Sequence, residues 1–254
     1  MSANWSEKGM QPENLEELIS ANDNRKTIYR FLARIYAREL TDDSLKELAK
    51  QRDLFLSLAQ VPEIRGTEIA EGFMTVAEFV SKLNEQDLSS VLLGLAAEYA
   101  GLFLGVRKVP PHPSESAYEN PEHLIMQKPR DDVLEIYRNM GLEKTRDFPE
   151  PEDHVAIELQ FMGHLCEKTN AALNEGSLQD AKKCLEVQRD FLDEHLGNWV
   201  PQLVTDILKS VKVDFYKGVA KITRGYIETD KKVVEELMDA LASSPTTNRK
   251  ESQT

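Results

Sequence analysis

The amino-acid sequence predicts an all-α protein: a single helical bundle of about ten helices, with a proline-rich loop and a hinge between its N- and C-terminal halves. Apolar residues recur in segment after segment at the three- and four-residue spacing of one helix face. No segment shows the strict alternation of a half-buried strand, and prolines gather in two short stretches. A chain of 254 residues can bury such a core without disulfides or metals.

The N-terminal half contains the first group of predicted helices. Their apolar stripes lie at residues 28–36, 69–80 and 88–103, with another helix starting near Leu48. Ser44 and Glu47 have the spacing of a capping box in front of that second helix. The stripe at 88–103 is the strongest, so we expect this helix to lie deep in the core and to end at Gly105 in a left-handed conformation.

Two breaks follow in the middle of the chain. Residues 105–129 contain five prolines, at 110, 111, 113, 121 and 129, which exclude continuous helix and predict a long ordered loop. A helix over 133–140 ends at Gly141, before the second break, TRDFPEPED, at residues 145–153. We expect the two halves to be joined by a hinge near 141–154.

The C-terminal half returns to helical spacing. Its stripes lie at residues 155–165, 178–192, 200–211 and 233–241. The expected organisation is therefore a flexible segment over 1–20, an all-helical domain over 21–242 and a flexible polar tail over 243–254.

Composition limits the partners and the compartment. The chain has 44 acidic and 31 basic side chains and a formal net charge of −13, which disfavours nucleic acid and anionic lipid and favours basic partners. The N-terminus lacks the pattern of a secretory signal, and no apolar run is long enough to span a membrane. The only cysteines, Cys166 and Cys184, are expected to be free thiols. We therefore expect a cytoplasmic protein without stable membrane insertion.

Catalytic and metal-binding patterns are missing from the sequence. Its glycines do not have the spacing of a phosphate-binding loop, and G-x-S-x-G does not occur. The histidines at 112, 123, 154, 164 and 195 include no His-x-x-x-His pair, and Cys166 near His164 is only a fragment of a zinc ligand set. The sequence therefore predicts no catalytic residue, no metal site and no cofactor.

Acidic residues gather between Leu142 and Gln160, around the second proline turn. Asp153 is placed to cap the following helix, and His154 can pair with Glu158 one turn later. The same residues can instead form an acidic lip that accepts guanidinium groups through charge-assisted, bidentate contacts. The residues of this cluster are Glu143, Asp147, Glu150, Glu152, Asp153 and Glu158.

Several blocks resemble the TorD/DmsD/NarJ family of redox-enzyme maturation chaperones in order and spacing. They are EYAGLFLG, the proline loop PPHPSESAY, FPEPEDHVAIELQFMGHLC and FLDEHLGNWVPQL. The third is the most specific, because Glu150, Pro151, Asp153 and His154 match the family pattern E-P-x-D-H. The resemblance covers roughly residues 29–199. The chain departs from the family where Val106 and Arg107 replace a Gly-Pro turn and PHPSESAY replaces the commoner loop sequence.

The resemblance implies an all-helical cytoplasmic chaperone. Its partner would be the twin-arginine signal peptide, or a related N-terminal segment, of the apo catalytic subunit of a molybdopterin oxidoreductase, held back from export until the cofactor is loaded. Such a signal offers two guanidinium groups followed by an apolar run, which an acidic lip beside an apolar groove would complement.

The resemblance also implies the residues of the peptide site. Asp153 and His154 would contact the peptide or act in the hinge, and Glu150 and Pro151 would shape the turn. The neighbouring surface would comprise Tyr99, Phe103, Glu115 and Tyr118, with His195 and Trp199 on the facing helix. From spacing alone, Tyr99 and Phe103 fit the core better than a contact surface, whereas His195 and Trp199 fit packing against each other as well as contact with the peptide.

Alternatives to the signal-peptide chaperone come from two other classes. One is a helical adaptor that binds another folded partner; the other is a small enzyme that binds a guanine nucleotide, a property suggested for the family. A domain-swapped dimer is conceivable as well as a monomer, because a long loop lies near the predicted hinge.

Overall fold

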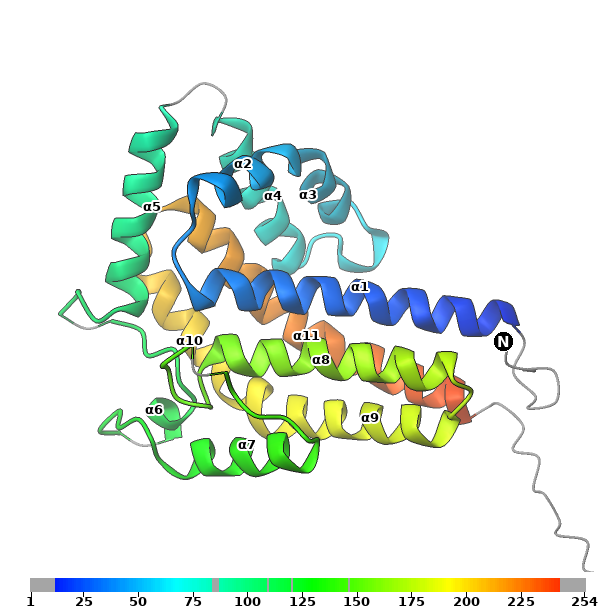
Figure 1. Cartoon of the computed structure of the whole chain (residues 1–254). Coiled ribbons are helices and arrows are strands. Elements are labelled where there is room, and N and C mark those ends of the chain that lie inside the picture. The colour runs from blue at the N-terminus through cyan, green and yellow to red at the C-terminus, as the bar shows by residue number, and fades with distance from the viewer. Residues whose placement is uncertain (1–11, 84–86, 109, 120, 146, 243–254) are drawn as a thin grey trace, which may run out of the picture.

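The computed structural model describes residues 12–83, 87–108, 110–119, 121–145 and 147–242 (Figure 1). Regular structure in these residues is helical, apart from an isolated bridge between Ser114 and His154. The predicted all-α class is confirmed. The elements are α1 (Pro12–Ala37), α2 (Asp42–Lys50), α3 (Arg52–Ala59), η2 (Pro62–Ile64), α4 (Glu68–Ser81), α5 (Leu88–Phe103), α6 (Ser116–Glu119), α7 (Lys128–Asn139), α8 (Val155–Asn174), α9 (Leu178–Phe191), the π-helical turn η4 (Leu192–Leu196), α10 (Gly197–Ser210) and α11 (Asp214–Ala242).

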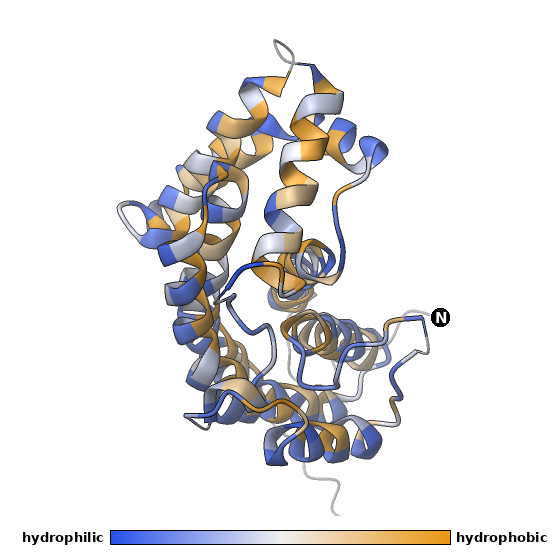
Figure 2. Ribbon diagram, turned by 90° about the vertical axis from the view of Figure 1, so that its left-hand side faces the viewer, coloured by the Kyte–Doolittle hydropathy of each residue, from blue (hydrophilic) through white to orange (hydrophobic). Residues whose placement is uncertain are grey.

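Helices from the two halves of the sequence pack against each other throughout the bundle. α1 lies along α8, and α4 lies along α11. Figure 1 shows α2 to α5 on one side of α1 and α7 to α9 on the other, while α11 runs behind them along most of the length. Figure 2 shows hydrophobic residues mainly on the inward sides of these helices. The two halves therefore share one core.

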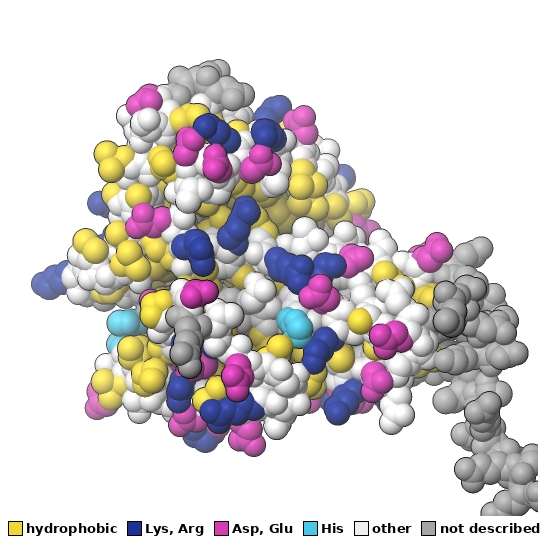
Figure 3. All heavy atoms as spheres, in the orientation of Figure 1, with side chains coloured by type: hydrophobic (Ala, Val, Ile, Leu, Met, Phe, Trp, Pro, Cys, Tyr) yellow, Lys and Arg dark blue, Asp and Glu magenta, His cyan; other side chains and the backbone are white. Residues whose placement is uncertain are grey.

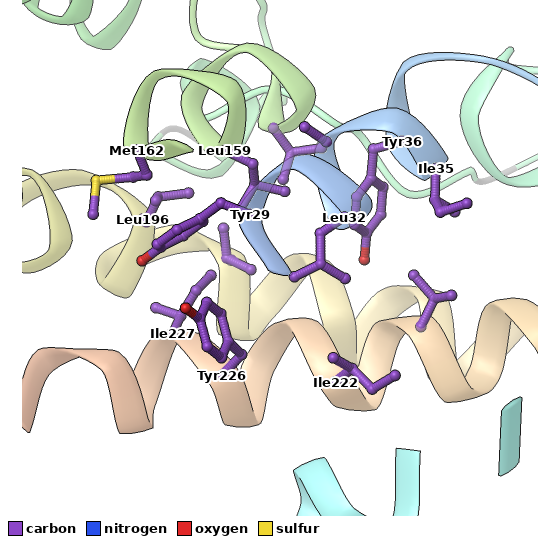
Figure 4. Close-up of a cluster of buried hydrophobic side chains, with 14 of the residues drawn as sticks. Tyr29, Leu32, Ile35, Tyr36, Leu159, Met162, Leu196, Ile222, Tyr226 and Ile227 are labelled. Carbon is purple, nitrogen blue, oxygen red and sulfur yellow. The ribbon is translucent and has the colours of Figure 1, made fainter. Parts of the chain in front are cut away.

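The centre of this core is formed where α1 crosses between α8 and α11. Tyr29, Leu32 and Tyr36 repeat at helical spacing, so one face of α1 is buried along its length. Figure 4 shows this face pointing toward side chains of α8, η4 and α11. The contacting side chains include Leu159, Met162, Leu196, Ile222, Tyr226 and Ile227.

A buried ion pair links the N-terminal part of α1 to α11. The Arg25 guanidinium makes bidentate contacts with Asp230, with Nε–Oδ1 and Nη2–Oδ2 distances of 2.6 and 2.8 Å. The Tyr29 hydroxyl donates a third hydrogen bond to this carboxylate at 2.5 Å. Asn22 accepts from Arg25 and donates to the Cys166 carbonyl oxygen at 2.7 Å, which adds α8 to the network. The ion pair is satisfied by enough hydrogen bonds to be tolerated in a core.

Several elements begin or end elsewhere than predicted. α1 begins at Pro12, so residues 12–20 are helical rather than a flexible segment, while residues 1–11 and 243–254 lie outside the described residues. The capping box is formed by Thr41 and Ser44, one turn before the predicted pair. Only the C-terminal half of α5 is deeply buried, and Leu93 is 73% exposed. Gly105 has the predicted left-handed conformation, with φ of +70°.

Backbone hydrogen bonds join the proline loop to the second proline break. The Glu115 amide donates to the Asp153 carbonyl oxygen at 3.0 Å, and the Val155 amide donates to the Pro113 carbonyl oxygen at 2.8 Å. Ser114 and His154 form the isolated bridge between them. The segment over 147–154 is therefore anchored to the loop before α8 begins.

Candidate functional site

A pocket of about 360 Å³ opens where α1, α5 and the second proline break meet. We call it the aromatic pocket. It is lined by Ala37, Arg38, Glu39, Tyr99, Phe103, Leu104, Phe148, Glu150 and His154. Three helix ends surround the pocket: α1 ends at Ala37, α5 ends at Phe103, and α8 begins directly after His154.

Aromatic rings form the apolar part of this pocket. The Tyr99 and Phe103 ring centroids lie 5.1 Å apart in an edge-to-face arrangement. The Tyr99 hydroxyl donates to the Tyr36 carbonyl oxygen at 2.9 Å, which fixes the orientation of its ring. Only 5% of Tyr99 is exposed. Burial raises the pKa of the Tyr99 phenol, with the Glu150 carboxylate adding to the effect, so this wall is uncharged.

Charged side chains stand at the rim of the pocket. Glu39 is exposed and Glu150 is half-buried, and neither carboxylate forms an ion pair within the part of the chain that the structure describes. The backbone carbonyl of Glu150 accepts a hydrogen bond from Lys144, which holds the turn. The rim therefore presents two carboxylates beside an aromatic surface, with Arg38 next to them.

His154 contributes to the pocket as the N-cap of α8. Its Nδ1 accepts a hydrogen bond from the Ala156 amide at 3.1 Å, and its ring meets that of Phe148 edge to face at 5.2 Å. Burial, aided by the positive charge of Lys144, lowers the pKa of His154 to about 3. The predicted capping by Asp153 and the predicted pairing of His154 with Glu158 are both wrong, since the imidazole itself caps the helix.

Asp153 points away from the pocket into the protein. Its Oδ2 accepts hydrogen bonds from the amide and the hydroxyl of Ser116, the first of these at 2.8 Å. The carboxylate is fully buried, and its hydrogen bonds to Ser116 hold the proline loop in place. Pro151 shapes the adjoining turn, because its carbonyl oxygen accepts the His154 amide at 3.1 Å.

A second group of predicted residues forms a buried polar network behind the loop. His195 Nδ1 lies 2.9 Å from Glu115 Oε2, and Trp199 Nε1 donates to Glu158 Oε2 at 3.0 Å. Burial is the main cause that raises the pKa of both Glu115 and Glu158, and the negative charge of Glu115 adds to the effect at Glu158. The Tyr118 ring packs on Trp199 at a centroid distance of 5.6 Å.

Part of that network borders a second hollow, of about 430 Å³, on the side of α6 and α7. We call it the acidic hollow. It is lined by Glu115, Glu119, Lys128, Pro129, Asp132, Glu135, Ile136, Asn139, Glu194 and His195. Lys128 pairs with Asp132, so the remaining carboxylates dominate the charge of its wall.

The predicted site residues therefore separate into distinct places. Tyr99, Phe103, Glu150 and His154 line the aromatic pocket. Glu115 and His195 line the acidic hollow, while Asp153, Tyr118 and Trp199 belong to the packing between loop and helices. Sequence reasoning missed Arg38, Glu39, Leu104 and Phe148. Leu104 and Phe148 could have been found from the sequence, because they lie within the blocks EYAGLFLG and FPEPEDHVAIELQFMGHLC that carry the resemblance.

Across the described ranges, no three His, Cys, Asp or Glu side chains come together in a way that could hold a metal ion. No helix within those ranges combines the length and apolar character needed to cross a membrane. Cys166 and Cys184 are free thiols, and burial raises the pKa of Cys166 to about 12.

Comparison with known proteins identifies the family. The chaperone protein TorD of Photobacterium profundum is 28% identical over 218 residues, covering 85% of this chain and 96% of that protein. TorD of Vibrio cholerae is 28% identical over 227 residues, and TorD of Shewanella oneidensis 27% over 230 residues, covering 98% and 95% of those proteins and 88% and 87% of this chain. These names agree with the prediction of a chaperone rather than an enzyme. The sequence pattern of the nitrate reductase delta subunit family matches residues 67–205, more than half of the chain, and the protein therefore belongs to this family of TorD- and NarJ-type chaperones.

Proposed function

We propose that this protein is a maturation chaperone that binds the twin-arginine signal peptide, or a related N-terminal segment, of a molybdopterin oxidoreductase in the aromatic pocket. It would keep the apo catalytic subunit in a cofactor-accepting state and delay its export. Membership of a chaperone family supports the broader role. The free thiols support a reducing compartment such as the cytoplasm.

The observation that carries the proposal is the pairing of rim carboxylates with an aromatic wall. Glu39 and Glu150 have no competing ion pair among the described residues, so each is available to accept a guanidinium group. Tyr99 and Phe103 supply ring surface next to these carboxylates. A guanidinium can pair with a carboxylate and stack on a ring at once, which a lysine ammonium does less well. An apolar side chain of the same peptide would fill the remaining pocket.

The test is a calorimetric titration of the purified protein with twin-arginine signal peptides at near-physiological salt. We expect micromolar or tighter binding that weakens at least tenfold when both arginines are changed to lysine, because the charge is kept and the planar fork is lost. A matched peptide with a polar run in place of the apolar one should also bind more weakly.

The outcomes separate the alternatives. Binding that is indifferent to the arginines and to the apolar run would contradict the proposal and favour a helical adaptor for another folded partner. A titration with guanosine nucleotides in the absence of peptide tests the enzyme alternative, for which we expect no heat of binding.

A further inference from the structure

Two large apolar residues are exposed directly after α5, and one of them lines the aromatic pocket. Leu104, which also lines the pocket, is 54% exposed, and Val106 is 73% exposed. They stand on either side of Gly105, directly after α5. We call these two residues the apolar ledge. Figure 3 shows hydrophobic side chains gathered at the left edge of the molecule, over the end of α5 and the loop that follows it.

The backbone of the ledge is held in a defined shape. The amides of Leu104 and Val106 both donate to the Ala100 carbonyl oxygen, at 3.1 and 3.4 Å. Gly105 allows this turn through its φ of +70°, which other residues adopt at a cost. Backbone hydrogen bonds at the end of α5 therefore hold the two exposed side chains in place.

Arg107 fastens the ledge to the rest of the bundle. Its Nη2 contacts Glu98 Oε2 at 2.7 Å, and its Nη1 donates to the Ser210 carbonyl oxygen at 2.7 Å. The other oxygen of Glu98, which is buried, accepts the Lys212 amide at 2.6 Å. Arg107 also lies against α5, since a Cβ atom at Gly101 would be only 2.8 Å from its Nε. One guanidinium thus joins the ledge to α5 and to the α10–α11 connection.

Single exposed apolar residues are common on protein surfaces and carry no meaning by themselves. This pair differs in three ways. Leu104 lines the pocket and Val106 follows it two residues later in the same bonded turn, Arg107 pairs with Glu98 rather than facing solvent, and the carboxylates Glu39 and Glu150 stand on the pocket's rim. A preordered apolar surface reduces the ordering entropy that binding must overcome. The arrangement suits a ligand that is cationic at one point and apolar at the next.

We propose that the apolar ledge binds the apolar run of the client peptide while Glu39 and Glu150 hold its basic residues, and that Arg107 is the positioning residue of this surface. The inference rests on the proposed function, because it places the same peptide across the same pocket. It adds a direction to the bound peptide, running from the rim carboxylates toward the end of α5, and it makes the ledge a determinant of client preference.

The experiment is a double-mutant cycle by calorimetric titration. Wild type and Val106→Ser are each titrated with a twin-arginine peptide and with the same peptide whose apolar run is replaced by serine. We expect Val106→Ser to weaken the apolar peptide roughly fivefold to tenfold, as loss of a buried valine side chain predicts, and to leave the serine peptide unchanged. Leu93→Ser is the matched control, since Leu93 is equally exposed but lies in the N-terminal half of α5, whereas the ledge follows the C-terminal end of that helix, and we expect no change there.

Arg107 is tested with the same peptides. Arg107→Ala should weaken the apolar peptide as Val106→Ser does, and Arg107→Lys should restore part of the loss, because lysine can still pair with Glu98. Arg107→Ala should leave the serine peptide's affinity unchanged, which separates positioning from general unfolding.

The failures of the two proposals can be told apart. Wild type that binds neither peptide overturns the proposed function, and this inference falls with it. Wild type that requires the arginines while Val106→Ser binds the apolar peptide as tightly overturns this inference alone. A change in molecular mass by light scattering in Val106→Ser, with peptide affinity unchanged, would also overturn it by assigning the ledge to contacts between copies.

Discussion

At the scale of single residues, the pattern E-P-x-D-H identified the right segment but not the role of each side chain. His154 reaches the aromatic pocket, whereas the carboxylate of its neighbour Asp153 accepts hydrogen bonds from Ser116 at the start of α6. Sequence spacing cannot reveal such a partner, because the contact joins residues 37 positions apart. Tyr99 was predicted to belong either to the core or to the peptide site. It is buried in the core and also lines the aromatic pocket, so the two roles do not exclude each other.

A pH prediction belongs to His154. Its pKa is about 3 in the folded protein, while an unfolded histidine titrates near 6.5, so the unfolded state binds more protons between these values. The free energy of unfolding should therefore fall as the pH drops through this window, by up to about 1.4 kcal/mol per pH unit from this group. His154→Asn keeps an acceptor for the Ala156 amide and removes the titration.

Urea denaturation of both proteins at pH 7.5 and 5.5 measures the effect. We expect wild type to lose about 1.4 kcal/mol more than His154→Asn over this interval. Contributions of Glu115 and Glu158, whose raised pKa values act in the opposite direction, are common to both proteins and cancel in the difference. Equal losses in the two proteins would show that His154 is not the buried neutral imidazole described here.

At the scale of elements, periodicity found most helices and misjudged the length of two. The inward face of α1 carries Asn22 and Arg25, so the uninterrupted apolar stripe in the sequence begins only at residue 28. α11 contains Gly218 and Gly225, which lower helix propensity, and only its last part was predicted. In both helices the residues that interrupt the apolar stripe make tertiary contacts. Arg25 of α1 pairs with Asp230, and Gly218 of α11 allows a close approach to α4. Burial was misjudged at α5, because periodicity does not show whether an apolar face is covered.

The close packing of α4 on α11 predicts that replacing glycine by alanine changes the protein's stability in opposite directions at two positions. A Cβ atom at Gly218 would lie 2.8 Å from Val76 Cγ2 and 2.9 Å from the Gly72 carbonyl oxygen, whereas one at Gly94 in α5 would meet nothing. Gly94→Ala should stabilise the protein by about 0.5–1 kcal/mol through helix propensity. Gly218→Ala should instead destabilise it by about 1–3 kcal/mol, because the two helices must move apart.

Chemical denaturation of the two variants beside wild type checks the signs. The comparison is matched, since both changes add one methyl group to a helix interior. Stabilisation by Gly218→Ala would mean that α4 and α11 do not pack as closely as the structure has them.

At the scale of the whole molecule, the two halves of the sequence are joined by packing as well as by the proline segments. α1 packs on α8 and α4 packs on α11, so each half supplies part of the other's core. A domain-swapped dimer, still a prediction, would have to rebuild both contacts with a second copy. The sequence could predict the helical class and the acidic charge, but not this pairing, because it depends on contacts between residues far apart in the chain.

We propose that the client's N-terminal segment binds the aromatic pocket rather than the acidic hollow. Either place could attract a basic ligand, since each carries carboxylates that form no ion pair with another of the described residues. Their difference is the aromatic wall, which only the first offers to a guanidinium and an apolar side chain together.

The most direct measurement compares two double variants by calorimetric titration with one twin-arginine signal peptide. Glu39→Gln with Glu150→Gln removes the carboxylates of the pocket rim, and Glu119→Gln with Glu135→Gln removes the same charge from the hollow. We predict at least tenfold weaker binding for the first variant, corresponding to about 1.4 kcal/mol, and less than threefold for the second. The reverse order, or equal losses in both variants, would contradict the claim.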